Sequence, residues 1–200
     1  MKHFCRIFVL LGLFISSGAL FAQENAGTVR VQLVTSAGDI TLKLYPQKSP
    51  VTVKNFLAYV DSGFYNETIF HRVISNFMVQ GGGFTTAMTE KESGEPIVNE
   101  SRNKLHNIRG TIAMARTSEP DSATAQFFIN QRSNLQLDWA PGKEGYTVFG
   151  EVEKGMGVVD FIATADTDTG LMVTNAGQRP FQDVPVEAIV IKKVVRIPGK

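Results

Sequence analysis

Hydrophobic and polar residues alternate along much of the chain with the period of two that is typical of β-strands. Residues 29–35 and 40–45 alternate in this way, and turn-forming residues at 36–39 lie between them, so the two segments predict a β-hairpin. Further strands are predicted at 70–74, 77–80, 110–116, 126–131, 147–152 and, as one long strand, 184–197.

Two segments have the spacing of amphipathic helices instead. Ser49 and Pro50 read as an N-cap followed by proline at the first helical position. The apolar residues that follow recur at i, i+3, i+4 and i+7, namely Val53, Phe56, Leu57 and Val60. Gly63 ends this helix, and a second helix is predicted at 156–164, with Val158, Val159 and Ile162 on one face.

The order of these elements predicts a mainly β protein of one domain. The polar stretch 85–106 reads as a long surface loop, and residues 117–122 carry turn chemistry. Eight turn-punctuated strands with two helices favour a closed eight-stranded antiparallel β-barrel with the helices packed against it. A barrel of this size is filled by side chains, so we expect any substrate to bind on its outer wall.

The first 22 residues form a separate segment. Lys2 and Arg6 precede an apolar run, and small residues end it at Ala22, which is typical of a secretory signal peptide. An uncleaved membrane anchor is the alternative, but a span needs about 20 apolar residues and the run is interrupted at 16–18. We therefore expect a signal peptide at 1–22, a mature domain at 23–200, a periplasmic location and no stable membrane insertion after cleavage.

Charge and cysteine content narrow the function classes. Cleavage after Ala22 removes two basic residues and no acid, which changes the net charge from +1 to −1. A near-neutral chain without a basic run gives no footprint for nucleic acid. Cys5, the only cysteine, leaves with the leader, so the mature protein has no thiol chemistry and no disulfide.

Candidate chemistry is concentrated in three segments that follow one another along the chain. In the first, Arg72 and Gln80 lie among large apolar residues, and strand alternation allows both to project onto one surface with an apolar floor. The segments are Phe70-His71-Arg72-Val73-Ile74 with Phe77-Met78-Val79-Gln80-Gly81-Gly82-Gly83, then Met114-Ala115-Arg116 with Gln126-Phe127-Phe128-Ile129-Asn130, and then Leu137-Asp138 with Tyr146-Thr147-Val148-Phe149-Gly150. Taken together, they resemble the cyclophilin family of peptidyl-prolyl cis/trans isomerases, and most closely its exported bacterial members, over roughly residues 28 to 197.

This resemblance implies an activity and a set of site residues. It makes Arg72 the catalytic arginine, and it makes Gln80 the glutamine that helps to hold Arg72 and the substrate backbone. The backbone of Ala115 and Arg116 would pair with the peptide on either side of the Xaa-Pro bond, in the groove that also holds Gln126. The proline pocket would be formed by Phe77, Met78, Phe128 and Leu137, with Tyr146 where the best-known members carry a histidine.

The implied reaction requires no cofactor and no metal. The Xaa-Pro bond has a rotation barrier of about 18–20 kcal/mol, and its nitrogen regains a lone pair in the twisted transition state. A cationic donor near that nitrogen and a dry pocket for the ring would stabilise the twisted form more than either planar form. The expected partners are proline-containing segments of unfolded or folding exported proteins, and nothing in the sequence demands a dimer.

The sequence departs from the resemblance at three places. Gln136 stands where the cyclosporin-binding members have a tryptophan, and Trp139 lies three positions later, so we expect weak cyclosporin binding with isomerase activity kept. The family asparagine after Ala115 is Arg116, where the expected role is largely that of the backbone. The loop from Arg116 to Gln126 also differs, which leaves the preference for flanking residues open.

Other interpretations stay open at this point. The chain could be a peptide-binding or chaperone-like module with little turnover, or a barrel that carries a small apolar ligand. Single residues also have structural explanations: Arg72 could be a solvated strand residue, and His71 is expected to be structural. Residues 166–170 hint at calcium but lack the required glycine and glutamate, so a solvated turn is expected there. The glycine run is not followed by Lys-Ser/Thr, which excludes a phosphate loop, and the sequons at Asn66 and Asn99 read as chance matches.

Overall fold

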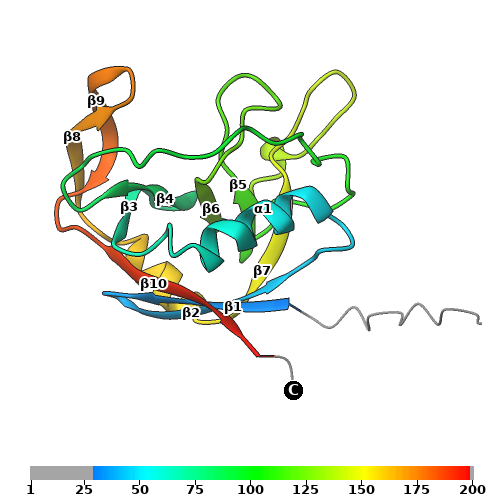
Figure 1. Cartoon of the computed structure of the whole chain (residues 1–200), viewed down its shortest axis with the longest axis horizontal. Helices are drawn as coiled ribbons and strands as arrows, with labels where there is room; N and C mark the ends of the chain where they lie inside the picture. The colour runs from blue at the N-terminus through cyan, green and yellow to red at the C-terminus, as the bar shows by residue number, and fades with distance from the viewer. Residues whose placement is uncertain (1–28, 199–200) are drawn as a thin grey trace, which may run out of the picture.

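The computed structural model describes residues 29–198, and the predicted signal peptide at 1–22 lies outside this range (Figure 1). The elements in chain order are β1 (Val29–Thr35), β2 (Gly38–Leu44), α1 (Pro50–Asp61), β3 (Thr68–Ile74), β4 (Met78–Thr85), β5 (Thr111–Met114), β6 (Phe127–Asn130), a 3-10 turn (Leu135–Leu137), β7 (Val148–Lys154), α2 (Met156–Ile162), β8 (Thr167–Thr174), β9 (Gly177–Pro185) and β10 (Val190–Ile197).

Eight of the strands form a closed barrel in the order β1-β10-β3-β4-β6-β5-β7-β2, and every neighbouring pair is antiparallel. β1 pairs with β2 to complete the ring. The predicted eight-stranded antiparallel barrel with two helices is therefore confirmed. Closure pairs the strand edges that an open sheet would leave exposed.

The interior of the barrel is filled with apolar side chains. Alternate residues of each strand point inward, and the largest of them, including Phe70, Phe127 and Phe149, are completely shielded from solvent. Both helices add their buried faces to the same cluster, α1 through Phe56 and α2 through Val159. A filled interior gives no support to the interpretation as a carrier of a small apolar ligand, so a binding site is expected on the outer wall.

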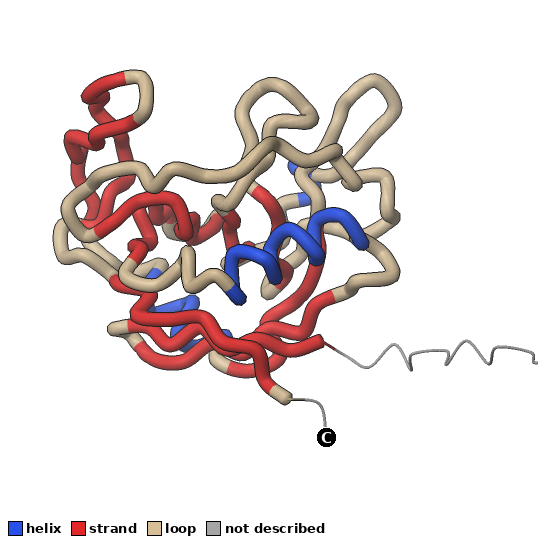
Figure 2. The backbone as a smooth tube through the Cα atoms, in the orientation of Figure 1, coloured by secondary structure: helices blue, strands red, loops and turns tan. Residues whose placement is uncertain are grey.

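The first helix begins and packs as predicted, but its N-terminus is stabilised in an unexpected way. Ser49 occupies the N-cap position without capping, because its hydroxyl donates to the carbonyl of Val148. Glu100 instead accepts hydrogen bonds from the backbone N–H groups of Val51 (3.1 Å) and Thr52 (2.9 Å). A carboxylate from the long loop thus satisfies helix donors and complements the helix dipole. Figure 2 shows this loop, drawn in tan, running over the surface between β4 and β5.

The prediction for the last part of the chain was wrong in two respects. The long strand at 184–197 is two strands, β9 and β10, separated at residues 186–189. The expected solvated turn at 166–170 is the start of β8, which pairs with β9 in a separate two-stranded sheet (Figure 1). Most residues of this hairpin are exposed, so it lacks the apolar alternation that marks the other strands.

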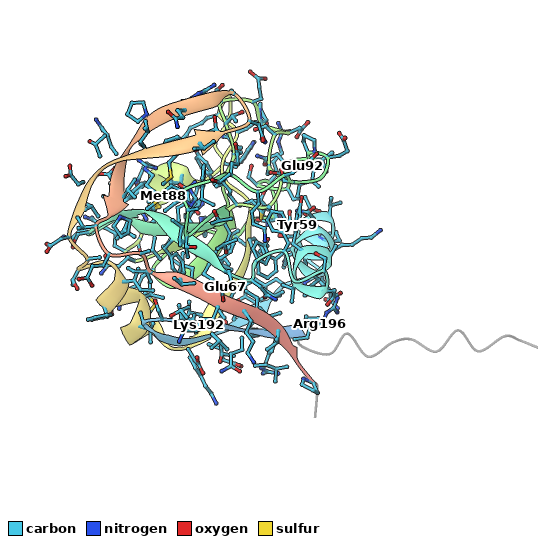
Figure 3. The ribbon with its side chains drawn as sticks, turned by 60° about the vertical axis from the view of Figure 1, so that its left-hand side comes forward. Tyr59, Glu67, Met88, Glu92, Lys192 and Arg196 are labelled. Atoms are coloured by element: carbon cyan, nitrogen blue, oxygen red, sulfur yellow. The ribbon has the colours of Figure 1, made fainter. Side chains whose placement is uncertain are left out.

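A few apolar residues hold the β8–β9 hairpin on the barrel. Met172 and Val184 are buried against Ile69 of β3 and Phe84 of β4, and Met88 packs against the same cluster. The backbone N–H of Val173 donates to the carbonyl of Met88 (2.8 Å), and Figure 3 shows Met88 beneath the hairpin. The hairpin therefore lies over β3 and β4, the strands that carry Arg72 and Gln80.

Candidate active site

The register of the barrel strands brings the predicted site residues into one row on the outer wall. Arg72 of β3 lies opposite Gln80 of β4, and Gln80 lies opposite Phe128 of β6. Phe128 in turn lies opposite Ala113 of β5. Because side chains on directly paired residues point to the same face of a sheet, this row forms a continuous surface across four strands.

A cavity of about 110 Å³ opens on this surface. This is several times the volume that one water molecule needs, so the cavity has room for a small side chain or ring. Its lining contains all the predicted site residues except Gln126, namely Arg72, Phe77, Met78, Gln80, Ala115, Arg116, Phe128, Leu137 and Tyr146.

The floor of the cavity is apolar and the rim is partly polar. Met78 and Phe128 are buried, with Ala113 and Val148 behind them in one cluster. The ring of Tyr146 meets that of Phe128 edge-on at 5.7 Å between centroids. The cavity thus offers a desolvated surface for an apolar ring, with Arg72 beside it.

The charged neighbour of Arg72 is Asp183, which the sequence did not reveal. Nε of Arg72 lies 3.6 Å from a carboxylate oxygen of Asp183 in β9, and both side chains remain about two-fifths exposed. Asp183 also has a left-handed backbone, with φ of 62°, which is unusual for a residue other than glycine. No alternation or motif in 177–185 could have placed this carboxylate, because the hairpin itself was not predicted.

Gln80 has a different partner from the expected one. Its side-chain amide donates to the side-chain oxygen of Gln126 at 3.0 Å, and Gln126 lies beside the cavity instead of lining it. Gly83 makes room for this arrangement, since a Cβ at that position would lie 2.5 Å from the Gln126 side chain. The expected role of Gln80 in holding Arg72 and the substrate backbone stays a prediction.

The opposite end of the cavity is built around the Arg116 side chain. Its guanidinium donates to the carbonyls of Thr117 (2.8 Å) and Ser118 (3.3 Å) on one loop. It also donates to the carbonyls of Glu144 (2.7 Å) and Gly145 (3.2 Å) on another. The same guanidinium stacks 4.5 Å from the ring centroid of Tyr146. The side chain, and not only the backbone as expected, contributes to the site.

A buried chain of amides fixes the turn that carries Leu137. Asn134 donates to the carbonyl of Phe77 (2.9 Å) and to the side chain of Asn130 (2.8 Å). Asn130 donates to Asn107 (3.1 Å), whose backbone and side chain donate to Asp138 (2.7 and 3.0 Å). Burial would raise the pKa of Asp138, but the hydrogen bonds from Asn107 and His106 lower it below its usual value. Two walls of the cavity are thereby joined by one satisfied polar network.

His71 is shielded from solvent where the β8–β9 hairpin packs on β3 and β4. It lies next to Arg72 in sequence but is buried, with its ring 4.7 Å from that of Phe84. Burial lowers the pKa of His71 from 6.5 to about 4, so the ring is neutral near pH 7. Its burial supports the expectation that His71 is structural, which stays a prediction.

The remaining candidate chemistry finds no support in residues 29–198. No group of three or more His, Cys, Asp or Glu side chains in this part of the chain is placed to hold a metal ion. No helix within the same residues is long and apolar enough to cross a membrane. Gln136 does not line the cavity, and Trp139 stacks on Arg102 at 5.4 Å.

Comparison with known proteins agrees with this geometry. Residues 30–195 match the family model "Cyclophilin type peptidyl-prolyl cis-trans isomerase/CLD". The peptidyl-prolyl cis-trans isomerase A of Dickeya dadantii is 55% identical over 165 residues, which cover 82% of this chain and 83% of that protein. A peptidyl-prolyl cis-trans isomerase of Acinetobacter baylyi is 52% identical over 179 residues, with 90% and 92% coverage. Among solved structures, a cyclophilin-type isomerase of Cryptosporidium parvum, crystallised in the presence of the dipeptide Ala-Pro, superposes with a TM-score of 0.68 at 28% identity and covers 85% of this chain and 99% of that one.

Proposed function

Because the chain belongs to the cyclophilin family of peptidyl-prolyl cis-trans isomerases, we propose that it is an exported isomerase that accelerates rotation about Xaa-Pro bonds in proteins folding outside the cytoplasm. The isomerase activity itself follows from the family. The substrates, the location and the roles of individual residues are the parts that we propose.

The observation that carries the proposal is the position of a guanidinium at the edge of an apolar cavity on the outer wall. Arg72 lines this cavity together with Met78 and Phe128. In the twisted transition state the prolyl nitrogen is no longer conjugated and can accept a hydrogen bond. Arg72 is the donor in the proposed mechanism, and the prolyl ring occupies the apolar floor.

The size of the expected effect shows why the cavity is needed as well as the arginine. A hydrogen bond from a charged group contributes about 1.5–3 kcal/mol. Each factor of ten in rate corresponds to about 1.36 kcal/mol, so Arg72 alone would provide roughly one to two powers of ten. Any further acceleration comes from holding the ring and the flanking backbone in the twisted geometry.

The backbone beside the cavity is where we place the peptide. Ala115 donates its N–H to the carbonyl of Gln126, and β5 has already ended at Met114. In the proposed complex an extended peptide pairs with the backbone of Ala115 and Arg116, in the manner of strand addition. The structure of the related Cryptosporidium parvum isomerase was determined in the presence of Ala-Pro, which agrees with a proline-containing peptide as the ligand proposed here.

Export is proposed from the sequence of residues 1–22. The proposed mature protein contains neither the leader nor a cysteine, which suits an oxidising periplasm. Its proposed clients are proline-containing segments of exported proteins, and it works as a monomer. Fractionation of cells that express the full chain tests this part: we expect the protein in the periplasmic fraction with its N-terminus near residue 23. Recovery of uncleaved protein in the cytoplasm or membrane would contradict export and leave the isomerase activity unaffected.

Turnover of a Xaa-Pro tetrapeptide by the mature protein separates the isomerase from a binding or chaperone-like module. We expect catalysed cis/trans exchange that Arg72→Ala reduces by about 10- to 100-fold, in line with the loss of one charge-assisted hydrogen bond. Equal rates for the wild type and Arg72→Ala, at unchanged peptide affinity, would favour the binding module.

A further inference from the structure

We propose that Arg116 is a specificity-determining residue, which makes this isomerase favour peptides with a carboxylate side chain next to the proline. This inference rests on the proposed function, since it concerns the substrate class of the same cavity. It depends on three features of the Arg116 guanidinium: how it is held, the lack of an ion pair to it, and its position relative to Arg72.

The guanidinium of Arg116 is fixed in place by backbone groups. It donates to four carbonyls, those of Thr117, Ser118, Glu144 and Gly145, at 2.7 to 3.3 Å. Tyr146 covers one face of it. An arginine side chain normally has many rotamers, and ordering it costs free energy when a ligand binds. Here the ordering is already present before any peptide arrives.

The charge of Arg116 is not paired with a carboxylate. Within residues 29–198, the ion pairs engage Arg72 with Asp183 and Arg102 with Glu144, whereas none of them includes Arg116. Glu144 approaches Arg116 only through its backbone carbonyl, because its carboxylate is bound to Arg102. Carbonyl dipoles orient the guanidinium, but their effect falls off faster with distance than that of the full charge. A cation without a counter-charge therefore lines the cavity.

The position of this cation matches a residue that flanks the proline. Arg72 is on β3 and Arg116 follows β5, and the order β3-β4-β6-β5 places three strand spacings between them. Three spacings amount to about 14 Å, which an extended peptide spans in roughly four residues. Both side chains reach into the cavity between them. A proline seated on the apolar floor between the two arginines lies about 7 Å from each strand position, so a residue one or two positions away from it lies next to Arg116.

A protease-free exchange assay with charged peptides tests this proposal. The peptides are Ala-Xaa-Pro-Phe and Ala-Ala-Pro-Xaa, in which Xaa is Glu, Gln or Lys. For the wild type we expect kcat/KM to fall in the order Glu, Gln, Lys on at least one side of the proline, with about a threefold to tenfold ratio of Glu to Lys at low salt, as one unit charge at this range provides. The ratio should shrink as salt shortens the screening length.

Three variants then assign the preference to Arg116. Arg116→Met should bring the ratio of Glu to Lys close to one. Arg116→Lys keeps the charge but loses the planar guanidinium, so it should keep part of the preference for Glu. Arg196→Met is the matched control, because Arg196 lies near the end of β10 (Figure 3), pairs with Asp61 and does not line the cavity. Its ratio of Glu to Lys should equal that of the wild type. The ratio is taken within each variant, so a general loss of activity cancels.

The outcomes separate this proposal from the proposed function. Turnover of the uncharged Gln peptides measures the isomerase activity without any effect of peptide charge. A wild-type ratio near one on both sides of the proline, or a ratio that Arg116→Met does not change, would overturn the role of Arg116 and leave the isomerase intact. If Arg116→Met does not fold, the salt dependence of the wild type and the Arg116→Lys ratio still decide the question.

Discussion

The inner and outer faces of the same strands serve different purposes in this protein. In β6, Phe127 points into the barrel and joins a cluster in which nearly every side chain is completely buried. Its neighbour Phe128 points outward and forms the floor of a cavity. The inner face is filled and therefore stabilises the fold, whereas the outer face leaves a space and is therefore able to bind. Strand alternation separates the two roles by a single position in sequence.

Truncation of the two phenylalanines gives the largest contrast. Phe127→Ala should reduce the free energy of unfolding by about 3–5 kcal/mol, because it leaves a void in a closed core. Phe128→Ala should cost less, since one side of that ring already faces an open cavity, but it should reduce isomerase activity strongly. Urea unfolding together with peptide exchange measures both quantities. A larger stability loss for Phe128→Ala than for Phe127→Ala would contradict the division between the two faces.

The neighbours His71, which is buried under the β8–β9 hairpin, and Arg72, which is partly exposed, extend the comparison of buried and exposed residues to pH. The pKa of His71 is lowered from 6.5 to about 4 by burial, so the unfolded chain binds a proton that the folded protein does not. Stability should be fully present above pH 6.5 and should fall as the pH drops from 6.5 to 4, by about 3 kcal/mol at 1.36 kcal/mol per pKa unit.

Unfolding measured between pH 7 and pH 4 checks this expectation. His71→Gln cannot titrate and should lose that part of the pH dependence, although it is less stable at pH 7. An identical pH profile for the wild type and His71→Gln would show that another group is responsible.

Cyclosporin affinity tests the outer wall without disturbing the core. Gln136 stands where the drug-binding members of the family have a tryptophan, and it does not line the cavity. We expect an inhibition constant well above the micromolar range, and Gln136→Trp should improve it by at least tenfold, as a buried aromatic contact can provide. Inhibition of the wild type at sub-micromolar cyclosporin would refute this expectation. Peptide turnover and the free energy of unfolding should change little in the same variant.

Asp183 offers the smallest expected effect on the outer wall. Its pair with Arg72 is half-exposed and long, and such pairs contribute about 0–1 kcal/mol. Asp183→Asn should reduce kcat/KM by no more than about fivefold, because Arg72 loses the neighbour that restricts its orientation. Asparagine tolerates the left-handed backbone at this position, so folding should be unaffected. A loss of a hundredfold would show that Asp183 has a direct role.

The burial of each strand also explains which parts of the fold could be predicted from the sequence. Strands with one buried face, such as β1 and β2, were predictable because their apolar residues alternate. The β8–β9 hairpin was missed because it buries little more than Met172 and Val184. Asp183 was missed with it, since the contact to Arg72 depends on how that hairpin lies on the barrel.

Long-range polar contacts were equally inaccessible to pattern analysis. Glu100 stabilises the start of α1 from 48 positions away, in place of the local cap expected from Ser49. The Arg116 side chain joins two loops through backbone carbonyls, which leave no trace in the sequence. Of the site residues that the resemblance implied, all but Gln126 line the cavity. The strand register places the residues of the family motif next to one another on the outer wall.

The central claim is that Arg72 acts on the twisted imide and not on peptide binding. Exchange spectroscopy on a bound Ala-Ala-Pro-Phe peptide measures both the affinity and the rate of cis/trans interconversion on the protein. We predict that Arg72→Ala and Arg72→Lys keep the affinity within a few-fold of the wild type, and that Arg72→Ala slows the bound interconversion by about 10- to 100-fold. An unchanged interconversion rate in Arg72→Ala, with affinity alone reduced, would contradict the account.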